Sequence, residues 1–491
     1  MKPIRYISLL LALGLIQSCA PVNEPHGGVT TAPYSSNDYM QLDNEQKYAI
    51  TSKLLATLYK GEPAAQFFDL GKGLSSPVLK QDIDHLAAIR TQLNTPVDDL
   101  GGRITATFDK HFSSDISNTR AIPMALLYEI PLSKEYYNRW MAYVLTNTIL
   151  FSPALELDSV DPADVETVYN NLVAWLDQGM TMSEIVYQHM ISEENWRRFR
   201  SPEDNTREMM EIYLMRFRDD EVPLASIACK NWFLTDASDD FQLRKTANVN
   251  SQPQTLLERN DIASCEDFYL ALSQHSQLKP AISRRIVDLL FAEYPVSKRA
   301  SLALSISRKN PVYFQDIFNS ILFSKDYLFN MQRTKGYEEA LYGTGKRIYW
   351  YDRAGIYGTI TNTNLVNMSQ KTMTLKLGRQ NETPKDSLSF AYYHKAIRDG
   401  LMLFRRSGTT TGHGGWDPTP LINSAEVASL SNDDFIHYLM LATVGRKAYD
   451  YEITALTPLM TSYSANRANQ TYIVMDYASR LSEFYSMKAI R

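Results

Sequence analysis

Capped amphipathic segments recur along most of the chain, and they constrain its fold more than any other feature. In one of them Asp161 is suited to cap a helix, Pro162 fits the first turn, and Gly179 is placed to end it. The next segment begins at Thr181 with a capping-box pattern, and another begins with Ser201 followed by proline. Because short loops separate such segments, we expect antiparallel helices packed as a bundle.

The predicted fold is mainly α: a multi-helix, bundle-like body with a small irregular, β-containing insertion in the C-terminal third. Glycines such as Gly343 and Gly345 open that insertion, alternating residues at 372–377 predict a strand, and the glycine-rich stretch 405–420 predicts a long surface loop. The expected divisions are a signal peptide at 1–18, a flexible tether at 19–44, a helical domain at 45–342, a loop-rich and partly β segment at 343–425, and C-terminal helices at 426–491.

The N-terminus has the parts of a secretory signal. Lys2 and Arg5 precede an apolar run that is too short to span a bilayer. The sequence Ile-Gln-Ser-Cys that ends at Cys19 resembles a bacterial lipobox, in which the cysteine thiol takes the lipid. Ala20 in place of Asp then implies sorting to the outer membrane. The alternative is an ordinary signal peptide with a chance cysteine.

The residues after Cys19 are rich in proline, glycine, serine and threonine, which pack poorly and predict a flexible tether. Two further cysteines, Cys229 and Cys265, would close a loop of about 37 residues as a disulfide in an oxidising compartment, or would be two free buried thiols. The net charge of −5 is spread along the chain without a basic tract, which argues against a nucleic-acid partner.

Several segments resemble a large exported bacterial family known as domain of unknown function 1800. The stretch 203–212, EDNTREMMEI, is similar to the family's EN-x-ARELLEL helix, and 222–233 resembles the helix that follows it. The stretches 275–287 and 314–328 resemble two later family helices. Thr206 departs from the family's alanine. The family has no settled activity, so the resemblance implies export, a helical build and work at the cell surface or envelope.

The family motif singles out Arg207, Glu208 and Glu211 as weak catalytic candidates. Glu208 and Glu211 lie three residues apart, so on a helix they share a face and could bind a cation or do acid–base work. The alternative is a ladder of ion pairs, because Arg207 is spaced four residues from Glu203 and from Glu211. The basic pair Arg284 and Arg285 is a binding candidate; the alternative is a structural contact with Glu208 across the bundle.

A second group of candidates lies in the C-terminal third. His413, Trp416 and Asp417 belong to the glycine-rich loop, where glycine permits a ligand to approach the backbone closely. His394, His413 and His437 are a weak alternative metal set, since imidazole is a common zinc and iron ligand but no diagnostic spacing is present. The sequence predicts no cofactor.

These observations favour a lipid-anchored outer-membrane protein that acts as a binding or assembly component of the envelope. Its expected partners are the membrane, through the lipid, and an envelope protein or polymer. No P-loop, dinucleotide fingerprint or nucleophile elbow occurs, which argues against an enzyme. The alternative is an envelope hydrolase that uses Glu208 and Glu211 or the histidine-bearing loop, with or without a metal.

Overall fold

The fold is mainly α, as the sequence predicts. The computed structural model describes residues 31–61, 68–69, 78–112, 121–150, 163–216, 218–237, 240–247, 250, 252–349, 357, 365, 418–462 and 466–490. Within these residues, no helix is long and apolar enough to cross a membrane.

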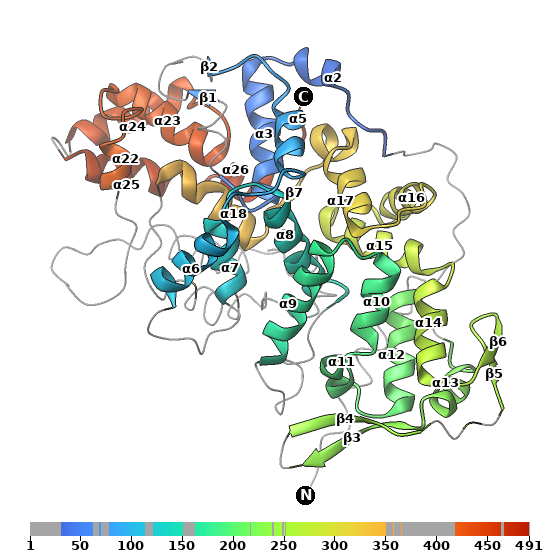
Figure 1. The fold of residues 1–491 in the computed structure, drawn as a ribbon. Coiled ribbons are helices and arrows are strands. Elements are labelled where there is room, and N and C mark those ends of the chain that lie inside the picture. The colour runs from blue at the N-terminus through green and yellow to red at the C-terminus, as the bar shows by residue number, and fades with distance from the viewer. Residues whose placement is uncertain are drawn as a thin grey trace, which may run out of the picture.

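The first group of helices, drawn blue to teal in Figure 1, includes α3, which packs mainly against α18 (Tyr337–Gly345) and the π-helical turn at Asp326–Asn330. Ten residues of α3 are buried, including residues on every side of the helix. The helices of this group are α2 (Ser36–Met40), α3 (Asn44–Thr57), α5 (His85–Gln92), α6 (Leu100–His111), α7 (Ala121–Glu129) and α8 (Lys134–Thr146).

The second group forms a lobe on one side of α3, drawn green to yellow in Figure 1. Two of its helix caps are those that the sequence predicted. Thr181 makes a capping box with Glu184, and Ser201 caps a helix whose first residue is Pro202. Its helices are α9 (Ala163–Asp177), α10 (Met182–Met190), α11 (Glu193–Arg198), α12 (Pro202–Leu214), α13 (Val222–Ala228), α14 (Cys265–Gln274), α15 (Leu278–Leu290), α16 (Val296–Ser307) and α17 (Phe314–Leu322).

The C-terminal helices lie on the opposite side of α3 from α16, drawn orange and red in Figure 1. They are reached through a π-helical turn at Asp326–Asn330, then α18 (Tyr337–Gly345) and a 3-10 turn at Lys346–Ile348. The helices are α22 (Thr419–Ile422), α23 (Asn432–Val444), α24 (Asp450–Ser462), α25 (Arg467–Ala478) and α26 (Ser482–Tyr485).

The described strands pair only as two-stranded antiparallel ribbons. The longest ribbon, β3 with β4, matches Trp232 with Lys245 at one end and Ala237 with Asp240 at the turn. The strands are β1 (Phe68–Asp69), β2 (Val78–Leu79), β3 (Trp232–Ala237), β4 (Asp240–Lys245), β5 (Gln254–Leu256), β6 (Arg259–Ile262), β7 (Arg333–Thr334) and β8 (Ser486–Met487).

Three expectations need correction. The tether does not extend to residue 44: Tyr39 is fully buried, and residues 32–34 pair with Phe323–Lys325. The helix expected over 222–233 ends at Ala228, because Trp232 begins β3 and so places β structure inside the helical domain. The segment expected to become loop-rich at 343 is still α18 as far as Gly345.

The strand predicted at 372–377 and the loop predicted at 405–420 lie outside the described residues.

Cys229 and Cys265 are joined by a disulfide, which is the first of the two states that the sequence left open. The bridge connects the end of α13 to the first residue of α14, and both cysteines are buried. It therefore closes a loop that contains both the β3–β4 and β5–β6 ribbons.

We expect reduction of this bridge to lower the free energy of unfolding by about 3 kcal/mol, because the open loop gains conformational entropy in the unfolded chain. Urea unfolding followed by tryptophan fluorescence, with and without dithiothreitol, measures the effect. The Cys229→Ser/Cys265→Ser variant is the control, since dithiothreitol should not destabilise it further. Identical urea midpoints for oxidised and reduced wild type would contradict the expectation.

Candidate functional site

The candidate site is a cleft of about 450 Å³ beside α3. Its walls come from α3, α18, the end of α23 and the C-terminal segment that includes β8. The charged side chains that line it are Glu45, Lys53, Lys335, Glu339, Arg347, Arg446, Glu483 and Lys488. Five of these are cations and three are carboxylates, so the wall carries an excess of positive charge.

Close packing of α3 against α18 sets the position of the cleft. A Cβ at Gly343 would lie 2.9 Å from the Cβ of Ala56, so a larger residue would push the two helices apart. A Cβ at Gly61 would likewise lie 2.7 Å from the carbonyl oxygen of Gly343. These two glycines therefore allow the approach that brings Lys53 of α3 and Arg347, just after α18, to the same cavity.

Lys53 is one of two deeply buried cations on the wall, with only 6% of its surface exposed. Its ammonium donates to the carbonyl oxygens of Leu328, Met331 and Lys488, at 3.2, 2.5 and 3.1 Å. Three acceptors match the three N–H groups of a charged lysine. Burial, with a smaller contribution from Arg333, lowers the pKa of Lys53 to about 7.

Arg347 is the other deeply buried cation on the wall, and it is also 6% exposed. Its guanidinium donates to the carbonyl oxygens of Gly61, Ser52 and Ala442, at 3.1, 3.3 and 3.4 Å. Burial lowers the pKa of Arg347. Lys53 and Arg347 thus bond to backbone carbonyls, which carry partial negative charge but no full counter-charge.

Lys335 adds a third cation to the same wall. Its ammonium donates to the carbonyl oxygen of Phe484 at 3.0 Å, and its pKa is lowered to about 7, chiefly by burial and then by Arg347. Lys488 and Arg446 lie farther along the wall, where Glu483 accepts from Lys488 at 3.1 Å. The cleft therefore combines buried cations with a partly neutralised rim.

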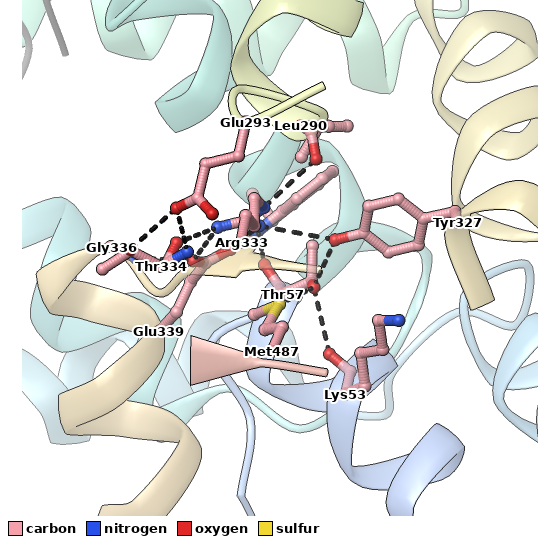
Figure 2. Close-up of polar contacts among 11 residues, drawn as sticks. Lys53, Thr57, Leu290, Glu293, Tyr327, Arg333, Thr334, Gly336, Glu339 and Met487 are labelled. Atoms are coloured by element: carbon pink, nitrogen blue, oxygen red, sulfur yellow. Dashed lines mark hydrogen bonds and ion pairs between the residues drawn. The ribbon is translucent and has the colours of Figure 1, made fainter. Parts of the chain in front are cut away.

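A buried ion pair forms the boundary behind the cleft. Arg333 makes two hydrogen bonds of 2.6 Å to the carboxylate of Glu339 and a third, of 3.1 Å, to the carbonyl oxygen of Leu290. Figure 2 shows Arg333 at the centre of this network, between Glu339 and Tyr327, with Lys53 on the neighbouring helix. The side chains of Arg333 and Glu339 are 7% and 8% exposed. This pair holds β7 against the start of α18 rather than offering charge to a ligand.

The carboxylates that the sequence singled out lie elsewhere, on α12. Arg207 pairs with Glu203 at 3.2 Å, which matches the ion-pair interpretation of that spacing. The pKa of Glu211 is raised to about 7, first by burial and then by the nearby charge of Glu208. Neither Glu208 nor Glu211 lines the cleft.

The remaining candidates fall in three places. On α15, Arg284 pairs with Asp288 one turn later on its own helix, and burial lowers the pKa of its neighbour Arg285. The ring of His437, on α23, accepts from the backbone N–H of Ala448 at 3.2 Å. Five of the candidates lie outside the described residues: Cys19, His394, His413, Trp416 and Asp417. The described residues contain no group of three or more His, Cys, Asp or Glu side chains that could hold a metal ion.

The sequence interpretation missed the cleft cations. Lys53 stands directly before the apolar run Leu-Leu-Ala in the second half of α3, and Lys335 stands within Arg-Thr-Lys-Gly. The available signal was a lysine beside apolar helical residues. Such a lysine either lies at the edge of the apolar face or is buried with its ammonium hydrogen-bonded inside the protein.

The ion pair should respond differently to single and double substitution. Glu339→Gln leaves the Arg333 charge buried without a counter-charge, and we expect a loss of about 3 kcal/mol in the free energy of unfolding. Arg333→Met/Glu339→Leu removes both charges and should cost less. Urea denaturation measures both, with Asp261→Asn in the exposed Arg259–Asp261 pair as a control that should leave stability nearly unchanged. A double variant less stable than Glu339→Gln would contradict this account.

Glu211 should make stability depend on pH. Its folded-state pKa lies above that of the unfolded chain, so the folded protein binds the proton more tightly and loses stability as pH rises from about 4.5 to 7. Glu211→Gln should therefore be more stable than wild type at pH 8, by about 1 kcal/mol after allowance for solvent screening, and nearly equal to it at pH 5. Urea midpoints at the two pH values test this, with Glu203→Gln on the same helix as the control. An equal difference at both pH values would exclude the expected titration.

Comparisons with known proteins were made at the level of family, sequence and structure. No family model matches the chain. No curated protein and no solved structure matches it either. The family resemblance of the α12 region therefore stays a prediction, and the function of the cleft is inferred from the residues that line it.

Proposed function

We propose that this chain is a lipid-anchored binding protein of the bacterial envelope and that its cleft takes a small organic anion. The observation that carries the proposal is the placement of Lys53 and Arg347 on the wall of one cavity, two buried cations whose partners among the described residues are carbonyl oxygens. The lipid anchor is the part of the proposal that rests on the sequence around Cys19.

The electrostatic argument starts from the cost of burying charge. A cation that is removed from water loses hydration, and carbonyl dipoles compensate only in part. The lowered pKa of Lys53 reflects that cost, and burial lowers the pKa of Lys335 as well. An anion placed in the cleft would interact favourably with Lys53, Lys335 and Arg347 together, in surroundings where water screens the attraction weakly.

The size and lining of the cleft indicate the class of ligand. A volume of about 450 Å³ lies within the range of sites for small molecules. Apolar side chains of Ala49, Val444 and Ile490 line it together with the charged groups. We therefore infer an organic molecule with a carboxylate or phosphate group, rather than a bare inorganic ion.

Export is supported by an observation that is independent of the leader. Disulfides persist mainly in oxidising compartments outside the cytoplasm. The buried Cys229–Cys265 bridge is consistent with such a location, while the outer membrane as the address remains a proposal from Ala20.

An envelope hydrolase is the second candidate. The pKa of Glu211, at about 7, is the observation that favours it, because a carboxyl group of that pKa can exchange protons near neutral pH. We place it second because the arginines expected to accompany Glu211 pair along their own helices, Arg207 with Glu203 and Arg284 with Asp288.

Calorimetric titration of the purified chain with citrate and with inorganic phosphate, at constant ionic strength, tests the proposal. We expect saturable binding of citrate that Lys488→Glu weakens about tenfold, or by about 1.4 kcal/mol, because the change reverses a charge on the wall. Binding should also weaken as pH rises through about 7, since an anion favours the protonated forms of Lys53 and Lys335.

The matched control is Lys230→Glu, which reverses an exposed lysine that follows α13 and does not line the cleft. It should bind citrate as wild type does. Absence of saturable binding with either anion, or equal weakening by both variants, would remove the proposal. Circular dichroism and urea midpoints of each variant separate loss of binding from loss of fold.

A further inference from the structure

We propose that one face of the body rests on the lipid surface to which Cys19 is anchored. This face, the α16 face, consists of Leu304, Arg308, Lys309, Val312 and Tyr313, which belong to the end of α16 and the loop that follows it. The inference rests on the proposed lipid anchor and adds the orientation of the body to it.

The first argument is the place where the described chain begins to contact the body. The backbone N–H of Thr31 donates to the hydroxyl of Ser305, and its carbonyl accepts from the ammonium of Lys309 at 3.0 Å. The next residues pair with Phe323–Lys325. The chain that leads back to Cys19 thus leaves the body beside α16.

The second argument is reach. Cys19 and Thr31 are 12 residues apart, a distance that is at most about 40 Å in any conformation. A body of this size is roughly 60 Å across. A chain of that length cannot pass around the body, so only the side near Thr31 can meet the membrane.

The third argument is the chemistry of the α16 face. Leu304, Val312 and Tyr313 are 43%, 43% and 44% exposed, which places two aliphatic side chains and a tyrosine in solvent within one short stretch. Tyrosine is enriched at the level of lipid headgroups. An apolar group of this kind in solvent is typical of a contact surface.

The charge on the α16 face also favours contact with a lipid surface. Arg308 and Lys309 flank the apolar residues, and Lys279 lies next to them through a hydrogen bond to Asn310. Asp316 is an acidic neighbour, and its carboxylate accepts from the backbone N–H groups of Val312 and Tyr313. Basic side chains near a bilayer are attracted to anionic headgroups. We therefore commit to an anionic lipid surface as the partner of this face.

Single fluorescent labels on the lipidated full chain test the proposal. Leu304→Cys and Val312→Cys place the label on the α16 face, and Leu459→Cys places it on α24, on the other side of α3 (Figure 1). Leu459 is a matched control because it is 49% exposed and also apolar. A free thiol is available only at the new cysteine, since Cys229 and Cys265 form a disulfide and lipidation occupies Cys19.

The protein is reconstituted into vesicles of phosphatidylethanolamine and phosphatidylglycerol that carry a headgroup-attached quencher. We expect quenching at positions 304 and 312 to be several-fold stronger than at 459. Equal quenching at the three positions, or stronger quenching at 459, overturns the orientation.

Flotation of the same samples separates the two levels of the proposal. Wild type should float with the vesicles, and Cys19→Ser should float less. A wild type that stays with the soluble fraction overturns the lipid anchor and with it the orientation. A wild type that floats, together with equal quenching of the three labelled variants, overturns the orientation alone.

Discussion

The hydrogen-bonding requirement of a helix that is buried on all sides governs the centre of this protein. Helix α3 has no face turned fully to water, so each polar group on it needs a partner inside the body. Lys53 meets that requirement through carbonyls from three separate places, Leu328, Met331 and Lys488. The position of the π-helical turn and of the C-terminal segment follows from this arrangement, because each contributes acceptors to the same ammonium.

The same cations have a structural role and a chemical one. Arg347 ties the end of α3, the residue Gly61 and the end of α23 together through backbone carbonyls, and it does so on the wall of a cavity. Arg333 is buried to a similar degree but differs in one respect, since Glu339 balances its charge. The contrast explains why the cleft, and not the ion pair behind it, is where a foreign anion would be stabilised.

The sequence predicted local structure better than it predicted the site. Caps such as Thr181 and Ser201 act over three or four residues, so their patterns can be seen in the sequence, and the structure confirms them. The site depends on residues such as Lys53 and Lys488, which lie far apart in the chain and meet only in the fold. The docking of residues 31–43 on the body was likewise not predictable, because their composition is typical of a tether until Phe323 and its neighbours supply hydrogen bonds. The carboxylates of α12 became candidates through the family resemblance and their local spacing, neither of which reports the cleft.

The pairing of residues 32–34 with Phe323–Lys325 has a mechanical consequence. Tension applied to the chain ahead of Thr31 would be transmitted through that pairing to the residue just before the π-helical turn. That turn supplies Leu328, one of the acceptors of Lys53, and Met331 follows it directly. If Cys19 carries the proposed lipid, a pull on it would be transmitted through this pairing to the ammonium at the cleft wall, and the geometry of the cavity would respond to tension on the anchor.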